Sequence, residues 1–264
     1  DYSRHYSRKS RLIERLRRLS VGISVRSRAL KNRALRADLI LCKTELTKNL
    51  LPADARLNAV SFTDVAPDTA IAVESPSIAH SGLCCIAVGR LDAWRGFDIA
   101  ILAVAKALKT CPDIRLAIVG KGVDRPRLEE LASKIGISEH VTFFGAVPAE
   151  IYRQLMNDTD IVLNPSLKEG AVTVSFDAMA MGKPLIALDT TGYTRYFHPD
   201  FSVVIPREDR DTTINAFADA IIRLSDPALR SRMGLQAKEA AKEITWQHHG
   251  EEIRDMILRH VDFN

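Results

Sequence analysis

Two arginines stand where their charge could hold an anion. Arg90 and Arg95 lie between an apolar run at residues 83–88 and a helical apolar pattern that begins at Phe97. A guanidinium offers a fork of N–H donors, and a helix N-terminus adds a dipole that favours negative charge. The combination suits a diphosphate, although the spacing alone also fits surface arginines on a loop.

A glycine-rich turn follows the next apolar run. Residues 119–125 read Val-Gly-Lys-Gly-Val-Asp-Arg, which imitates the G-x-G-x-x-G fingerprint of dinucleotide-binding sites. Arg125 takes the place of the third glycine, and no acidic residue ends the following apolar run. We therefore expect a tight turn that lines a ligand cleft, without a nicotinamide or flavin cofactor.

Two carboxylates occupy a third candidate segment, at residues 164–184. Glu169 and Gly170 precede an expected helix, and Asp177 lies about one and a half turns along it. First-turn backbone amides can hold phosphate oxygens, and the carboxylates could accept hydrogen bonds from sugar hydroxyls on either side of a diphosphate. The alternative is that Glu169 caps the helix and Asp177 faces solvent.

Six short apolar runs alternate with helical patterns and must position these residues. The runs cover residues 83–88, 114–119, 141–144, 161–163, 185–188 and 203–205. Such runs, separated by helices, predict an α/β fold with a Rossmann-like parallel sheet covered by helices on both faces. The candidate residues then follow the carboxyl ends of the strands, where ligands bind in such sheets.

The chain upstream of residue 81 reads as part of a second α/β unit. Residues 37–42 read as one strand, and residues 45–51 as a short helix. One strand cannot bury a sheet of its own, so we expect an incomplete amino-terminal remnant. We place this remnant at residues 1–65, a linker at 66–80, and the sheet domain with its carboxyl-terminal helices at 81–264.

Composition excludes several classes of protein. Of the 264 residues, 46% are hydrophobic and 27% charged, which is typical of a globular chain and not of a disordered or fibrous one. No apolar run approaches the roughly 18 residues of a membrane-spanning helix. The four cysteines lack metal-binding spacing and read as reduced thiols, so we expect a cytoplasmic protein. Asp1, in place of an initiator Met, indicates a cut end.

Positive charge is concentrated at the amino terminus. Residues 1–36 hold 12 Lys and Arg against 2 Asp and Glu, whereas the remaining residues hold 25 against 31. A basic amphipathic helix suits an anionic membrane surface, and a solvated helix face is the alternative. Nucleic acid is not expected as a partner, because no aromatic platform or recognition motif accompanies the charge.

The motifs, taken in order, resemble a known family. They are Gly89-Arg-Leu with a following basic residue and Gly96, Val119-Gly-Lys-Gly, Phe143-Phe-Gly-Ala-Val-Pro, Asn164-Pro-Ser with Glu169-Gly, and Asp177-Ala-Met-Ala-Met-Gly-Lys-Pro. Over about residues 82–250 this order resembles the carboxyl-terminal, donor-binding domain of family 4 glycosyltransferases, which are retaining enzymes of the GT-B fold. Residues 37–45 resemble the segment that ends the amino-terminal, acceptor-side domain of that family.

The resemblance implies a role for each candidate residue. Arg90 and Arg95 would bind the donor diphosphate, Glu169 would be the catalytic residue at the hydroxyls of the donor sugar, and Asp177 would contact the nucleotide ribose. The base would be surrounded by segments that include Gly120, Gly145 and Val147. The backbone contacts to sugar and phosphate would come from Gly170, Ala171, Val172 and Thr173.

The resemblance also implies an activity, the transfer of a sugar from a UDP-, GDP- or ADP-sugar to an acceptor hydroxyl with retention of the anomeric configuration. No DxD-type metal motif follows an apolar run, so the arginines would take the place of a metal, and neither a metal nor a cofactor is expected. The acceptor would bind mainly to the amino-terminal domain, and the sequence does not identify it.

Three residues depart from the family pattern. Arg95 stands where Lys is usual, Asp177 where Glu is usual, and Arg195 where the loop after Gly192 usually has Glu. Asp is one methylene shorter than Glu, and Arg presents a planar fork where Lys presents a point charge. These departures leave open an alternative, a non-catalytic nucleotide-sugar-binding module or subunit that requires a partner chain.

Overall fold

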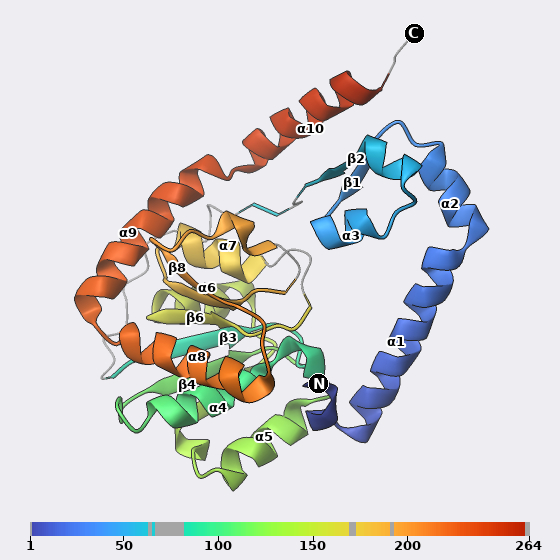
Figure 1. Cartoon of the computed structure of the whole chain (residues 1–264). Coiled ribbons are helices and arrows are strands. Elements are labelled where there is room, and N and C mark those ends of the chain that lie inside the picture. The colour runs from blue at the N-terminus through green and yellow to red at the C-terminus, as the bar shows by residue number, and fades with distance from the viewer. Residues whose placement is uncertain (1, 63–64, 67–81, 169–172, 191–192, 262–264) are drawn as a thin grey trace.

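A six-stranded parallel sheet forms the larger part of the fold (Figure 1). The computed structural model describes residues 2–62, 65–66, 82–168, 173–190 and 193–261. The strand order is β5-β4-β3-β6-β7-β8, and every pairing is parallel. The strands are β3 Cys84–Val88, β4 Arg115–Val119, β5 Val141–Gly145, β6 Ile161–Asn164, β7 Leu185–Leu188 and β8 Ser202–Ile205. All six predicted strands are confirmed, and with them the α/β fold with a Rossmann-like parallel sheet.

Helices cover both faces of this sheet, as predicted. The helices on one face are α4 Phe97–Ala107, α5 Arg125–Lys134 and α8 Arg210–Arg223, and those on the other are α6 Ala149–Asn157, α7 Thr173–Ala180 and α9 Pro227–Glu243. Successive side chains of a strand enter different cores, since Cys85 and Ala87 belong to the first and Ile86 to the second. Burial of both faces explains why the strands carry uninterrupted apolar runs.

The amino-terminal residues form a smaller unit with its own two-stranded sheet. Its elements are α1 Arg8–Arg26, α2 Arg28–Leu35, β1 Ile40–Cys42, α3 Glu45–Asn49, the short 3-10 helix Asp54–Asn58 and β2 Ala59–Ser61. The 3-10 helix Tyr2–His5 precedes α1 and places Tyr2 in the core of the sheet domain. The expectation of a single strand here was wrong, because β2 pairs in parallel with β1 and places Ala59 opposite Ile40. A strand of three residues shows no period in the sequence, and its pairing depends on main-chain hydrogen bonds that only folding brings together.

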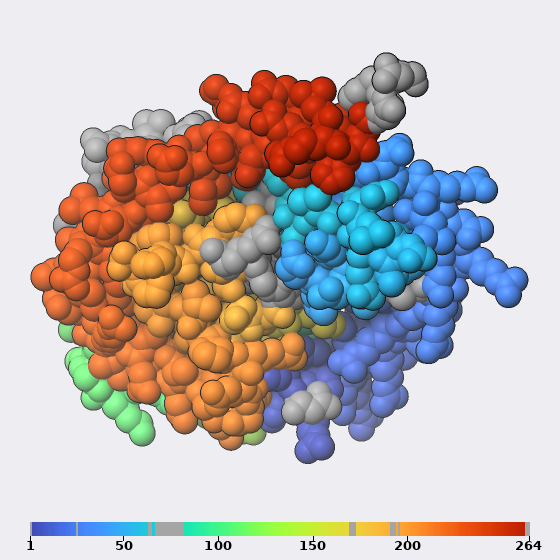
Figure 2. Space-filling view, turned by 45° about the horizontal axis from the view of Figure 1, so that its top comes forward, coloured from blue at the N-terminus to red at the C-terminus, as the bar shows by residue number. Residues whose placement is uncertain are grey.

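The last helix, α10 (Trp246–His260), leaves the six-stranded sheet and crosses to the amino-terminal unit (Figures 1 and 2). The ring of His249 is buried and lies 5.2 Å from the ring of Phe62, which follows β2. Residues 67–81, which contain most of the expected linker, lie outside the described residues. The division at residues 65 and 81 therefore stays a prediction. The contact of His249 with Phe62 shows that α10 packs on the smaller unit.

Two glycines let the loops at the carboxyl edge of the large sheet touch through their backbones. A Cβ on Gly120, whose φ is +136°, would lie 1.8 Å from the carbonyl oxygen of Gly89. A Cβ on Gly96, whose φ is +70°, would lie 2.2 Å from the carbonyl oxygen of Pro165. Any side chain at these positions would push apart the loops that follow β3, β4 and β6.

We expect Gly120→Ala to lower the free energy of unfolding by about 2 kcal/mol or more, because the new Cβ would meet backbone atoms in a strained conformation. Urea unfolding followed by circular dichroism measures the change. The control is Gly250→Ala in α10, where a Cβ meets nothing within 4 Å. That substitution should raise the free energy of unfolding by about 0.5–1 kcal/mol. A similar result for both variants would contradict the close backbone contact at Gly120.

Candidate functional site

The loop after β3 carries Arg90 and Arg95 to the carboxyl edge of the sheet, just before α4. The Arg90 side chain is 67% exposed, and its Nη2 lies 3.1 Å from Oδ2 of Asp92. Helix α4 has Gly96 as its N-cap, without a side-chain hydrogen bond to the first amides. Positive charge and an uncapped helix N-terminus therefore adjoin each other in this loop, as the sequence predicted.

Arg95 is half-buried and packed, in contrast with Arg90. Its Cζ lies 4.5 Å from the centroid of the Trp94 ring. Its guanidinium also lies beside Gly89, because Nε and Cζ would each be 3.9 Å from a Cβ built on that glycine. Arg95 therefore points back toward the end of β3 and is not a solvated surface arginine.

The ends of β4 and β5 meet in the tight turn that the sequence predicted. The backbone N–H of Gly120 donates to the carbonyl oxygen of Gly145, at 2.7 Å. Arg125 closes this corner by donating from Nη2 to the carbonyl oxygen of Phe143, at 3.3 Å. Val147 follows, half-buried against the core. Arg125 thus fills the place where the third glycine of the dinucleotide fingerprint would bring helix and strand together.

Part of the segment after β6 lies outside the described residues. The undescribed candidates are Glu169, Gly170, Ala171 and Val172, and the side chain of Arg195 is also undescribed, so their expected roles stay predictions. Thr173 begins α7 and is exposed. Nδ2 of Asn164 donates to Oγ of Ser175 at 3.2 Å, which ties the end of β6 to α7.

Asp177 is buried, with 3% of its surface exposed. The alternative that it merely faces solvent was therefore wrong. The hydroxyl of Tyr152, on α6, donates to Oδ2 of Asp177 at 2.8 Å. The physical reason is that α6 and α7 cover the same face of the sheet, which brings the tyrosine over the carboxylate.

Tyr152 is a site residue that the sequence did not reveal. Burial raises its pKa, and the nearby charge of Asp177 raises it further. The phenol therefore stays protonated and remains a donor over the whole neutral range. The sequence does not show that this tyrosine, on an amphipathic helix, contacts a carboxylate 25 residues later in the chain.

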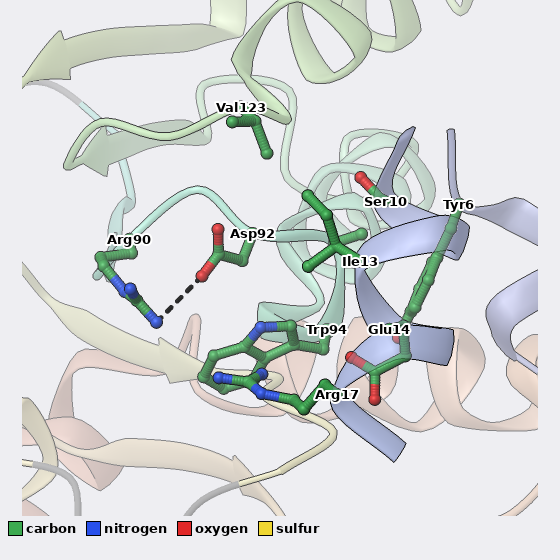
Figure 3. Close-up of a pocket in the computed structure, with 10 residues that line it drawn as sticks. Tyr6, Ser10, Ile13, Glu14, Arg17, Arg90, Asp92, Trp94 and Val123 are labelled. Carbon is green, nitrogen blue, oxygen red and sulfur yellow. Dashed lines mark ion pairs between the residues drawn. The ribbon is translucent and has the colours of Figure 1, made fainter. Parts of the chain in front are cut away.

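Helix α1 packs against the loop that carries the arginines (Figure 3). A pocket of about 200 Å³ separates them, with Tyr6, Ser10, Ile13, Glu14 and Arg17 on one side and Arg90, Asp92, Ala93, Trp94 and Val123 on the other. Cζ of Arg17 lies 5.2 Å from the centroid of the Trp94 ring. Glu14 is 5% exposed and forms an ion pair with Lys168, in the loop after β6. From the sequence this helix was predicted only as a basic amphipathic arm, and its position at the site was not predicted.

In the part of the chain that the structure describes, no group of three or more His, Cys, Asp or Glu side chains could hold a metal ion. None of the helices in this part of the chain is both long and apolar enough to cross a membrane.

The model of the family "Glycosyl transferases group 1" matches residues 73–240 of this chain. The chain is 33% identical to the D-inositol 3-phosphate glycosyltransferase of Nocardia farcinica, over 62% of this chain and 38% of that protein. It is 31% identical to the alpha-D-kanosaminyltransferase of Streptomyces kanamyceticus, over 57% of this chain and 38% of that protein. The chain therefore spans about two fifths of the length of these curated relatives.

Solved glycosyltransferase structures share the fold. Anabaena HepE (Alr3699), solved in complex with UDP-glucose, superposes with a TM-score of 0.74 at 20% identity and covers 88% of this chain and 67% of its own. The pneumococcal O-GlcNAc transferase GtfA, solved with UDP and GlcNAc, gives a TM-score of 0.71 at 18% identity, over 88% of this chain and 47% of its own. The six-stranded sheet is thus one half of a GT-B fold, as the sequence predicted.

We expect Tyr152→Phe to lower the free energy of unfolding by about 1–3 kcal/mol at neutral pH, because the buried Asp177 carboxylate loses a donor. Above about pH 10 the unfolded wild-type chain releases the Tyr152 proton while the folded chain keeps it. Wild-type stability should therefore fall faster with rising pH than that of the variant, and the two free energies should converge.

Urea unfolding at neutral pH and above about pH 10 tests both expectations. The same substitution in an Asp177→Asn background should have a smaller effect, because the pair is already broken. A constant difference between wild type and variant across this pH range would contradict the hydrogen bond from Tyr152 to Asp177.

Proposed function

The chain belongs to the group 1 glycosyl transferases, and we propose that it binds a nucleotide-diphosphate sugar and takes part in transferring that sugar to an acceptor hydroxyl. The observation that carries the proposal is the position of Arg90 and Arg95, beyond the central strand β3 and before the N-terminus of α4. The names of the relatives and the UDP and UDP-glucose of the structural neighbours support it.

The proposed chemistry is electrostatic stabilisation of a leaving diphosphate. As the bond to the sugar breaks, negative charge builds on the diphosphate while the sugar becomes oxocarbenium-like. Arg90, Arg95 and the first-turn amides of α7 would oppose that charge, and such preorganised donors contribute several kcal/mol in related sites. We infer that the arginines make a metal unnecessary, and that transfer retains the anomeric configuration as the family 4 resemblance implies.

The remaining candidates would hold the rest of the donor. Glu169 would accept hydrogen bonds from the hydroxyls of the sugar, with the backbone of residues 170–173 beside it. Asp177 would accept hydrogen bonds from the ribose. Its burial and its bond from Tyr152 support a rigidly held carboxylate, which costs less conformational entropy on binding than a free one. Gly120, Gly145 and Val147 would surround the base.

We propose that the acceptor side includes α1, and that this helix meets an anionic membrane surface. Leu12, Leu16 and Leu19 are 58%, 57% and 64% exposed and share one face of the helix. Glu14 and Arg17, which contact the sheet domain, lie on the opposite face. Leu12 and Leu16 thus point away from the domain, with arginines beside them, as in helices that lie in a bilayer interface. The protein would be cytoplasmic and peripheral to the inner face of the membrane.

Calorimetric titration with UDP, GDP and ADP tests the donor site, and we expect one of them to bind in the micromolar to millimolar range. Arg90→Ala and Arg95→Ala should each weaken binding about tenfold, the usual cost of a lost charge-assisted hydrogen bond. Glu169→Ala should leave the affinity for the nucleoside diphosphate unchanged but weaken binding of the sugar nucleotide.

The control is Arg254→Ala, since Arg254 is 65% exposed and lies on α10, outside the loops of the site. Absence of binding by the folded wild-type chain would contradict a donor site on this chain. If the chain binds the sugar nucleotide but transfers its sugar to no acceptor that is offered, the result would favour a binding module that requires a partner chain.

Co-sedimentation with vesicles tests the membrane contact. We expect the chain to bind vesicles that contain phosphatidylglycerol, and to bind them less as salt increases. Leu12→Ser combined with Leu16→Ser should weaken binding about tenfold or more, because two exposed leucine side chains would no longer enter the bilayer interface. The control, Leu235→Ser, removes a leucine that is 70% exposed on α9. No binding to vesicles of either composition would contradict the proposed contact and favour a solvated helix face, whereas equal binding to pure phosphatidylcholine vesicles would contradict the anionic preference.

A further inference from the structure

Trp94 joins two of the loops that carry the proposed donor site. It lies in the loop after β3, and its carbonyl oxygen accepts a hydrogen bond from the backbone N–H of Leu167, in the loop after β6, at 2.9 Å. Two residues later, Gly96 lies against the backbone of Pro165. The indole is therefore attached to a main chain that is fixed at both of these points.

Two guanidinium groups lie against this one indole. Cζ of Arg95 is 4.5 Å from the ring centroid, and Cζ of Arg17 is 5.2 Å from it. Both distances are inside the range of about 6 Å in which a cation is attracted to the face of an aromatic ring. Arg95 comes from the same loop as the tryptophan, whereas Arg17 comes from α1, more than 70 residues earlier in the chain.

The contact with Trp94 suits an arginine better than the lysine of the family pattern. A planar guanidinium can lie flat on an indole and still offer N–H donors at its edge, whereas an ammonium group has no such face. Held between Trp94 and the end of β3, Arg95 loses less side-chain entropy when an anion arrives than a free arginine would. The two arginines on one ring also repel each other, and a bound anion would relieve that repulsion.

We propose that Trp94 is a positioning residue for the diphosphate: its indole holds Arg95 in place, and through Arg17 it links α1 to diphosphate binding. This inference rests on the proposed function, since it needs a nucleoside diphosphate at Arg95. The ion pair of Glu14 with Lys168 gives α1 a second contact, on the loop after β6. Helix α1 thus contacts both loops that would hold the phosphates and the sugar.

The first test uses the fluorescence of the two tryptophans in the chain, Trp94 and Trp246. The probes are the nucleoside diphosphate among UDP, GDP and ADP that binds the wild-type chain most tightly, and the matching monophosphate. In Trp246→Phe, whose remaining indole is Trp94, we expect the diphosphate to change the emission and the monophosphate to change it far less. In Trp94→Phe the emission of Trp246 should stay constant. Constant emission of Trp94 at saturating diphosphate would overturn the proposal.

The second test compares affinities. Trp94→Leu should weaken diphosphate binding about three- to tenfold, the cost of a lost cation–π contact, while monophosphate binding stays within about twofold. Trp94→Phe keeps an aromatic face and should restore most of the loss, and Arg17→Gln should weaken diphosphate binding less than Trp94→Leu does. Equal losses for both nucleotides, or no rescue by phenylalanine, would show that Trp94 is only structural.

The outcomes separate the two levels of inference. If the wild-type chain binds no nucleoside diphosphate, both the proposed function and the role of Trp94 fail. If it binds, but the emission of Trp94 does not change and Trp94→Leu does not weaken diphosphate binding, the role of Trp94 alone fails. Should Trp94→Leu not fold, the fluorescence comparison still decides, because it needs only the two phenylalanine variants.

Discussion

The close backbone contact between the loops after β3 and β4 is the constraint on which the site depends. Gly120 lies so near the carbonyl oxygen of Gly89 that no side chain fits between them, and Gly96 stands in the same relation to Pro165. Parallel strands bring their carboxyl ends to one edge of the sheet, and glycines at these positions let the loops contact one another through their backbones. Arg90, Arg95 and Trp94 are held in that closed arrangement.

Around this edge the protein holds charged groups by packing them. Arg95 lies on Trp94, the buried Glu14 pairs with Lys168, and the buried Asp177 accepts a hydrogen bond from Tyr152. A charge that is fixed before a ligand arrives costs little reorganisation when the ligand binds, and this is the main way in which enzymes stabilise developing charge. Two of these contacts lie at positions that depart from the family pattern, since Arg95 lies over an indole and Asp177 accepts a hydrogen bond from a tyrosine.

Several contacts of the described residues connect the amino-terminal segment and the sheet domain, and Tyr2 and Tyr6 are buried in the core of that domain. Helix α1 approaches the loops of the site through Arg17 and Glu14, and α10 returns from the sheet domain to pack His249 on Phe62. The chain belongs to the group 1 glycosyl transferases and shares the GT-B architecture of its structural neighbours. In this chain, α1 contacts the loops after β3 and β6, which carry residues of the proposed donor site.

The sequence alone determined the six strands, the helices on both faces and the positions of the motifs, because strands buried on two faces must carry continuous apolar runs. It also determined that Arg90 and Arg95 follow a strand. Only the tertiary structure decided that β2 pairs with β1, that Tyr152 covers Asp177, and that α1 lies on Trp94. Each of these is a contact between segments far apart in the chain, and local periodicity carries no information about which surfaces meet. The sequence left open whether Asp177 binds a ligand or faces solvent, and its burial follows only from the packing of α6 beside α7.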